Sequence, residues 1–258
     1  MIMKTAKVKS LGLQLITPEW PAPENINALM TTRSGGVSVD PYDSMNLGTH
    51  VGDLAASVEK NRDILNCALK LPCDPIWLNQ THSTIVADHQ ISKSGDEADA
   101  IVSHQAKAVC AIMTADCLPV LLCDKQGSVV AAAHAGWRGL QAGILEKTVK
   151  MLGANPDDII VWLGAAISQA HFEVGLEVRE AFISSHANAE SAFLRSDDNP
   201  EKWFADIYEL AKIHLGSIGV LRQNIYGGGH CTYSESTTFY SYRREAQTGR
   251  MAALIWKD

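Results

Sequence analysis

Two side chains that can carry chemistry, Cys117 and His134, occur in two apolar segments separated by a short polar turn. The segments are ADCLPVLLCD, which ends at Asp124, and VVAAAHAG, which ends at Gly136. Two apolar runs around a short turn that contains glycine predict a β-hairpin. In an antiparallel register His134 then lies opposite Cys117 or within about two positions of it, and facing Cβ atoms are about 5 Å apart. We therefore expect a thiolate and an imidazole to meet at the open end of the hairpin.

This pair supports two kinds of chemistry. A soft thiolate and imidazoles suit zinc, or copper in some contexts, and the best candidate for a third ligand is His82 in the segment LNQTHS. Such a Cys-His-His set leaves one tetrahedral position for water or substrate, as catalytic zinc sites do. Alternatively, Cys117 is a nucleophile and His134 is its base, as in thiol hydrolases. The simplest alternative is that both residues are ordinary members of an apolar core.

Other polar residues near predicted turns are candidates for substrate contacts. Arg33 in TTRSGG could hold a phosphate or a carboxylate, unless it is a solvated turn arginine. Asn46 in SMNLG and Gln80 in NQTHS could recognise an amide or a purine edge, and the alternative for both is hydrogen bonding within a turn. Arg243 and Arg244 are interpreted as strand neighbours that face opposite sides.

The pattern of the whole chain predicts an α+β fold, with mixed, largely antiparallel sheets flanked by helices. Several apolar runs are hydrophobic throughout, which is typical of strands buried on both faces. The residues before Pro23 are expected to be irregular or an edge strand. The predicted strands are 27–32, 77–78, 109–113, 118–123, 129–133, 159–163, 239–243 and 251–256. The predicted helices are a segment capped by Asp53 and ended by Pro72, and segments 140–152 and 203–215, which are followed by Gly153 and Gly216.

Composition narrows the class of protein. The chain has 258 residues, 46% of them hydrophobic and 20% charged, and shows no linker, so residues 1–258 are expected to form a single domain. A net charge of −7 disfavours a nucleic-acid polymer as partner. No apolar run is long enough for a membrane span, and the first residues lack the features of a secretory signal, so a cytoplasmic location is expected. Six cysteines without a CxxC pair do not indicate a disulfide framework.

Taken together, the motifs resemble a known bacterial family. In order, they are TTRSGGVS, NLGTHVGD, LNQTHS, MTADCLPVLLCD, AAAHAGWRGL, FEVG, GGHCTY and FYSYRREAQTGRMAALIW. This series resembles the proteins once labelled polyphenol oxidase or laccase-domain proteins, also known as the YfiH family of purine nucleoside phosphorylases and peptidoglycan editing factors. The resemblance runs from about Asn27 to Trp256. One departure is Ala165, which stands where the family usually has proline, and it should loosen a turn without touching the candidate ligands.

The resemblance implies a layered α/β sandwich shared with toxin-type cysteine hydrolases. It also implies a zinc site made of His82, Cys117 and His134. The implied activity is phosphorolysis of purine nucleosides such as adenosine, inosine and methylthioadenosine, together with adenosine deamination. The older label implies copper-dependent oxidation of phenols, and a third family role is hydrolytic editing of a mis-incorporated amino acid in a cell-wall precursor.

These activities make different demands on the residues. Deamination fits a zinc-bound water whose pKa is lowered to ~7, and amide hydrolysis fits the same site or a Cys117 nucleophile. Phosphorolysis needs an anion clamp, for which Arg33 is the first candidate and Arg244 the second. Multi-copper oxidation ranks last, because the nine histidines show no paired His-x-His clusters. A non-catalytic metal protein would instead show a closed site with four protein ligands.

Overall fold

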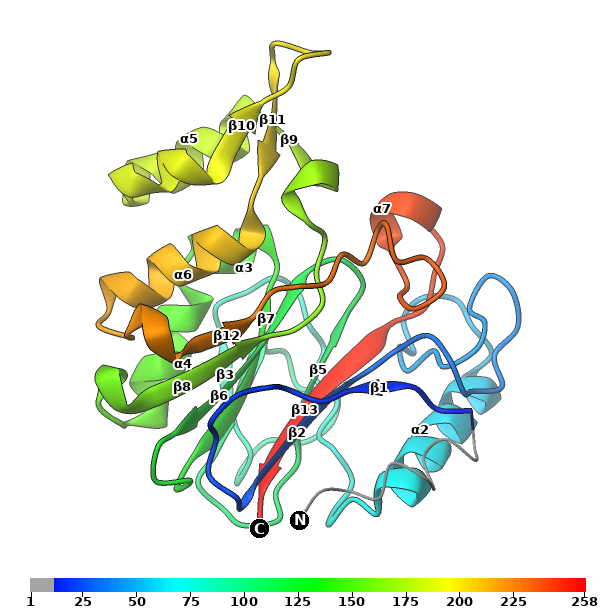
Figure 1. The fold of residues 1–258 in the computed structure, drawn as a ribbon. Helices are drawn as coiled ribbons and strands as arrows, with labels where there is room; N and C mark the ends of the chain where they lie inside the picture. Colours follow the sequence, from blue (N-terminus) through cyan, green and yellow to red (C-terminus); the bar gives the residue numbers. More distant parts are fainter. Residues whose placement is uncertain (1–11) are drawn as a thin grey trace.

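The centre of the fold is a six-stranded mixed sheet (Figure 1). The protein is represented by a computed structural model that describes residues 12–258, so the start of the predicted irregular N-terminal segment lies outside the described residues. The two outermost strand pairs of this sheet are parallel and the inner pairs are antiparallel. In spatial order its strands are β12 (Ile225–Gly227), β8 (Ile159–Leu163), β6 (Leu118–Asp124), β7 (Val130–Ala135), β4 (Ala100–Ser103) and β3 (Val86–Asp88).

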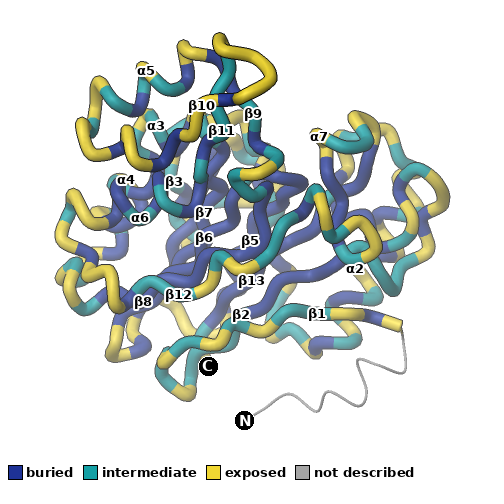
Figure 2. The backbone as a smooth tube through the Cα atoms, turned by 45° about the horizontal axis from the view of Figure 1, so that its top comes forward, coloured by how far each residue is buried: buried dark blue, intermediate teal, exposed yellow. Residues whose placement is uncertain are grey.

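The predicted hairpin is confirmed as β6 and β7. Pro119 pairs with His134, so Cys117 precedes the partner of His134 by two residues, within the expected register. Both strands are buried along their whole length, as Figure 2 shows for the middle of the molecule. Successive residues of β6 alternate between two hydrophobic clusters, with Leu122 in one and Leu121 in the other. The uniform hydrophobicity of the hairpin therefore reflects a sheet covered on both faces.

A second, antiparallel sheet covers one of those faces. Its side chains Ile112 and Ala253 pack toward the central sheet, while Leu29 and Leu254 pack on the other side in a cluster with Leu65 of helix α2 (Ala55–Leu69). Helices α4 (Ile144–Leu152) and α6 (Ile207–Ser217) cover the opposite face of the central sheet, which gives layers in the order helix, sheet, sheet, helix (Figure 1). This arrangement confirms the predicted class of mixed sheets flanked by helices. The strands in order are β1 (Leu15–Ile16), β2 (Ile26–Thr31), β13 (Met251–Lys257) and β5 (Cys110–Thr114).

A small three-stranded sheet and one helix form a lobe beside the central layers (Figure 1). Both strand pairs of this sheet are antiparallel. The strands in order are β10 (Phe193–Arg195), β11 (Lys202–Ala205) and β9 (Glu173–Gly175).

The helices of the protein are α2 (Ala55–Leu69), α3 (Trp137–Gln141), α4 (Ile144–Leu152), α5 (Leu176–Ser185), α6 (Ile207–Ser217) and α7 (Tyr242–Glu245). Short 3₁₀ turns are Pro156–Asp158, Gln169–His171, Ala187–Ala192 and Arg222–Asn224. No helix in residues 12–258 has the length and apolar character that crossing a membrane would need.

Two of the predicted helices have different limits in the structure. The segment 140–152 is divided into α3 and α4, because Gly143 adopts a left-handed conformation with φ +94° that breaks the helical path. The segment 203–215 begins too early, because Trp203 lies in β11. The helix α6 starts after Asp206, whose carboxylate accepts a hydrogen bond from the Glu209 N–H at 3.0 Å.

Three smaller expectations were also wrong. The residue that caps α2 is Leu54 instead of Asp53, and this helix ends before the left-handed Lys70 instead of at Pro72. Segment 239–243 is not a strand, because Ser241 caps the short helix α7. Segment 77–78 makes no named strand and is flanked by isolated bridges. In contrast, the edge strand expected before Pro23 is confirmed by β1, and the strand expected at 27–32 is confirmed by β2.

One buried hydroxyl ties three segments of this fold together, which predicts its contribution to stability. Tyr208 accepts a hydrogen bond from the Ala166 N–H at 2.8 Å and donates one to the His230 carbonyl at 2.7 Å. Tyr208→Phe leaves the buried Ala166 N–H without its partner and removes the bond to the His230 carbonyl, so we expect the free energy of unfolding to fall by about 1–3 kcal/mol. Urea titration measures this change. The control Tyr242→Phe, at a side chain that is 58% exposed, should change it by less than about 0.5 kcal/mol; equal effects would contradict the assignment.

Candidate metal centre and substrate cavity

A fully buried carboxylate, that of Asp99, organises the candidate site. It lies immediately before β4 and accepts hydrogen bonds from the backbone N–H groups of Thr81, His82 and Ser83 at 3.2, 3.0 and 2.6 Å. The Ser83 hydroxyl donates a fourth hydrogen bond at 2.7 Å. Nδ1 of His134 lies 2.7 Å from the same carboxylate. Asp99 thereby fixes both the loop that carries His82 and the orientation of the His134 ring.

The structure brings His82, Cys117 and His134 together. Nε2 of His82 lies 3.6 Å from Sγ of Cys117, and the two imidazole rings have centroids 4.8 Å apart at an angle of 67°. One potential ligand atom from each residue lies within 4.8 Å of the others. Ligand atoms on one tetrahedral zinc stand roughly 3.3–3.7 Å apart, so small side-chain shifts would complete such a site. Because Asp99 occupies Nδ1 of His134, its Nε2 is left for a metal, as in carboxylate–histidine–metal arrangements. These residues can therefore hold a metal ion.

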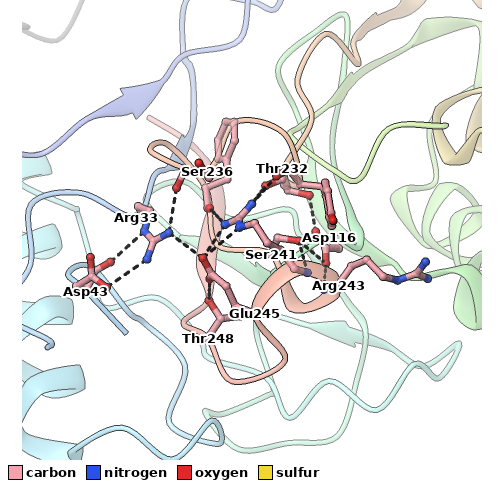
Figure 3. Close-up of polar contacts among 12 residues, drawn as sticks. Arg33, Asp43, Asp116, Thr232, Ser236, Ser241, Arg243, Glu245 and Thr248 are labelled. Carbon is pink, nitrogen blue, oxygen red and sulfur yellow. Dashed lines mark hydrogen bonds and ion pairs between the residues drawn. The ribbon is translucent and has the colours of Figure 1, made fainter. Parts of the chain in front are cut away.

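A second buried carboxylate fixes the position of Cys117. Asp116 adopts a left-handed conformation with φ +85° at the turn between β5 and β6. Its carboxylate accepts hydrogen bonds from the Thr232 hydroxyl at 2.6 Å, the Ser241 hydroxyl at 3.0 Å and the Arg243 N–H at 2.7 Å (Figure 3). The turn that presents Cys117 is thus fastened to the C-terminal loop of the chain.

The charges of the site are coupled. Burial would raise the pKa of the Cys117 thiol, but the neighbouring imidazoles of His134 and His82 outweigh burial and lower that pKa. Burial would also lower the pKa of His134, but the Cys117 sulfur and the Asp99 carboxylate outweigh burial and raise it. Both shifts favour a thiolate beside an imidazolium, and the thiolate is the form that either binds a metal or acts as a nucleophile.

The three candidate ligands face a cavity of about 730 Å³. This volume is within the range of small-molecule sites. The cavity lies where the hairpin, the C-terminal loop and the small lobe meet. Its aromatic lining residues are Trp137, Phe172 and Tyr242, and its cationic ones are Arg138, Lys202, Arg243 and Arg250.

Arg33 and Arg244, the expected anion clamps, are both outside this cavity. Arg33 lines a separate depression and forms ion pairs of 3.2 Å with Asp43 and with Glu245. Arg244 donates to the carbonyl oxygens of Thr232, Tyr233 and Phe239 at 2.7–2.8 Å. Figure 3 shows the Arg33 guanidinium between Asp43 and Glu245. Because their donors are already engaged, this geometry gives both arginines a role in holding the C-terminal loop.

The two expected amide contacts are placed differently from each other. Asn46 is fully buried and accepts hydrogen bonds from the N–H groups of Gly48 and Arg250, both at 2.9 Å, so it shapes the turn beside the cavity. Gln80 does line the cavity, but its amide donates to the Met113 carbonyl at 2.8 Å and accepts from the Met113 N–H at 2.7 Å. Both side-chain amides are therefore engaged in hydrogen bonds with backbone groups in this structure.

Sequence reasoning missed several residues that shape this site. Asp99 precedes an apolar strand in DEADAIV, and an acidic residue entering a buried strand was the available signal. Arg138 follows His134 by four residues, in the helix directly after the hairpin strand, and this closeness in sequence could have placed it near the hairpin end. Arg250 and Lys202 reach the cavity from segments that are distant in the sequence, so no local sequence pattern predicted their place there.

Close packing at Gly136 predicts an effect on metal binding. A Cβ atom there would lie 2.5 Å from Cδ2 of His82 and 3.1 Å from Sγ of Cys117. The backbone of Gly136 has φ −62°, which alanine adopts without strain, so Gly136→Ala should preserve the fold and weaken zinc binding by about 10-fold or more. Competition with a zinc-binding dye measures the affinity. The control Gly229→Ala, whose Cβ meets nothing within 4 Å, should bind zinc normally; unchanged affinity in Gly136→Ala would argue against the site.

The lowered pKa of Cys117 predicts how the metal-free thiol reacts. A lowered pKa means that thiolate persists below the ordinary thiol range, so alkylation of Cys117 by iodoacetamide should continue to a lower pH than for a free thiol. His134→Ala removes the main group that lowers this pKa, and the midpoint of the pH profile should rise. Mass spectrometry of the Cys117 peptide measures the rate, with the exposed Cys67 as a monitor of reagent. A wild-type midpoint at the ordinary thiol value would refute the ion pair.

Known proteins resemble this chain over nearly its full length. A family model described as multi-copper polyphenol oxidoreductase laccase matches residues 27–258. A Pseudomonas aeruginosa protein named purine nucleoside phosphorylase PA4543 is 53% identical over 241 residues, which cover 93% of this chain and 97% of that protein. The Escherichia coli protein named purine nucleoside phosphorylase YfiH is 51% identical over 247 residues, covering 94% and 98%.

Solved structures agree with these relatives. The crystal structure of Neisseria meningitidis protein NMB0706 has a TM-score of 0.89 and 48% identity, and it covers 95% of this chain and 99% of its own. The crystal structure of Bacillus licheniformis protein YfiH has a TM-score of 0.88 and 28% identity, covering 97% and 98%. Because a family model and relatives more than 50% identical match almost the whole sequence, this chain belongs to the YfiH family, which is described as multi-copper polyphenol oxidoreductase laccase.

Proposed function

We propose that this protein is a purine nucleoside phosphorylase whose His82, Cys117 and His134 bind zinc, with adenosine deamination as a second activity. The observation that carries this proposal is the cavity, which brings three candidate metal ligands, aromatic side chains and a group of arginines into one space. Relatives that are named purine nucleoside phosphorylase support the same substrate class.

The lining of the cavity suits a purine base. Trp137 and Phe172 are largely shielded from solvent, and Tyr242 stands at the exposed rim. Aromatic faces bind purines by stacking, which contributes about 1–3 kcal/mol per base. Arg138 packs on one face of Trp137, with its guanidinium carbon 4.4 Å from the ring centroid. These side chains would hold the purine ring beside the candidate metal centre.

We assign the phosphate to Arg250, with Arg138 in support. The Arg250 side chain donates from one terminal nitrogen to the carbonyl oxygens of Thr248 and Gly249, both at 3.0 Å, and it lines the same cavity as the three candidate ligands. Its second terminal nitrogen is then available for a phosphate oxygen. In phosphorolysis that oxygen forms a bond to C1′ of ribose, the C1′–N9 bond breaks, and the purine leaves with the electron pair and takes up a proton.

Zinc in this site would supply a Lewis acid and, for deamination, a water of lowered pKa. The protein contributes the geometry: Asp99 orients His134 and the loop of His82, and Asp116 orients Cys117. In deamination, water adds to C6 of adenosine and ammonia leaves. Copper-dependent oxidation of phenols ranks last, because residues 12–258 bring potential ligands together only in separate groups of three.

One observation favours a second candidate, a thiol amidase acting on a cell-wall precursor. Asp99, His134 and Cys117 form a chain of contacts in which a carboxylate orients an imidazole beside a thiolate. This is the arrangement that activates a cysteine nucleophile. The Cys117 sulfur would attack the amide carbonyl, His134 would protonate the leaving amine, and water would then hydrolyse the thioester.

A substrate screen tests the proposed phosphorylase. Zinc-loaded protein is incubated with adenosine, inosine or methylthioadenosine. It should release the purine base only when phosphate is present. It should release ammonia from adenosine even without phosphate. Arg250→Gln removes a charge-assisted contact, so we expect the KM for phosphate to rise roughly 10- to 100-fold while the KM for nucleoside stays near the wild-type value.

Two controls sharpen this experiment. Arg222→Gln alters an arginine whose side chain is 65% exposed, and it should leave both KM values unchanged. Arg33→Gln tests the anion clamp expected from the sequence. It should lower the free energy of unfolding and leave the KM for phosphate near the wild-type value.

Metal removal separates the two candidate functions. It should abolish phosphorolysis, whereas a Cys117-dependent amidase should remain active without metal. Base release independent of phosphate and metal would refute the phosphorylase.

A further inference from the structure

A second group of potential ligands lies in the helical layer, away from the substrate cavity. Glu146 is in the first turn of α4, His214 is in the last turn of α6, and His186 directly follows α5. Figure 1 shows these helices stacked along one side of the molecule. One potential ligand atom from each residue lies within 4.8 Å of the others. Three side chains from three separate helices thus converge on one point.

Each of these residues has a buried polar atom without a hydrogen-bond partner in the part of the chain that the structure describes. The atoms are Oε2 of Glu146, Nδ1 of His186 and Nε2 of His214. A buried polar group left unpaired costs about 1–3 kcal/mol. A single such group could be tolerated, but three on neighbouring side chains indicate that the cluster holds a bound group.

The orientation of the rings favours a cation over other ligands. Nδ1 of His214 lies 2.6 Å from Oε1 of Glu146, so this ring nitrogen and the carboxylate can share a proton or a metal ion. The rings of His186 and His214 have centroids 4.4 Å apart at an angle of 55°. The edge-on ring of Phe182 shields His214, whose side chain is only 1% exposed. Lone pairs and a carboxylate in a shielded space attract positive charge.

We propose that Glu146, His186 and His214 form a second binding site for a divalent transition-metal ion, with zinc as the expected occupant. Two imidazoles and one carboxylate are a ligand set that zinc accepts, and a water would complete the coordination. An entry path exists, because the Glu146 side chain is 25% exposed and His186 is partly exposed.

The site would have a structural effect on the substrate cavity. The ion would tie α5 to α4 and α6. At its other end α5 follows directly from β9, and Glu173, Gly175 and Glu177 of this region line the cavity. Metal in the helical layer would therefore hold the small lobe in place against the central sheet. This inference does not depend on the proposed function, because neither the ligands nor the effect involves the substrate.

Metal stoichiometry tests the site. Full-length protein saturated with zinc and then freed of excess metal should contain two ions per chain, and His186→Ala should contain one. Cys117→Ser should lose the other ion, and the double variant should lose both. His104→Ala, which removes an exposed histidine, is the matched control and should retain two ions. A wild-type content of one ion that depends on Cys117, or a content that His186→Ala does not change, would overturn the proposal.

Cobalt spectroscopy separates the two sites by their ligands. Cobalt(II) bound at Cys117 gives a thiolate-to-metal charge-transfer band, whereas the proposed site contains no sulfur and should give only ligand-field bands. In the Cys117→Ser background, cobalt should therefore produce ligand-field absorption without the charge-transfer band. Glu146→Gln keeps the shape of the side chain and should weaken this binding by about 10-fold or more. Loss of the absorption in His104→Ala, or its persistence in His186→Ala, would assign the cobalt to another place.

Discussion

The carboxylate of Asp99 is the constraint on which the site depends. It is fully buried, and it satisfies its oxygens with three backbone N–H groups, one hydroxyl and one imidazole. A buried charge is tolerated only when it is paired and hydrogen-bonded to this extent. The same group therefore holds the backbone of the His82 loop and the ring of His134, which places the two imidazoles beside Cys117.

Asp116 plays the complementary role for the sulfur. Its hydrogen bonds to Thr232, Ser241 and Arg243 join the turn after β5 to the loop before β13. Those two strands are antiparallel neighbours in the second sheet, so the segment after β5 and the segment before β13 lie at the same end of the strands. Arg33 and Arg244 strengthen the same loop through Glu245. The floor of the cavity is thus made of the two sheets and the C-terminal loop, while the small lobe forms one wall and packs into the same hydrophobic cluster as the central sheet.

Local reasoning predicted the parts of the fold that depend on neighbouring residues. The hairpin and its register were predicted, because a short turn and continuous apolar strands allow little choice in how two adjacent segments pair. Boundaries were less accurate where one residue overrides a pattern. Gly143 divides a helix whose apolar spacing is otherwise continuous, and Asp206 delays the start of α6 because its side chain caps the helix there. His82 was a candidate ligand from its position, and the resemblance to a family made it specific.

The sequence by itself determined that a thiol and an imidazole would meet at the end of a buried hairpin, because the pairing of adjacent strands is a local matter. Only the tertiary structure decided which charges join them. Asp99 reaches His134 across a strand pair, and Arg250 approaches from the C-terminal loop. The ligands Glu146, His186 and His214 come from three helices that share no local pattern. Such meetings depend on the order in which layers pack, and no spacing within one segment records that order.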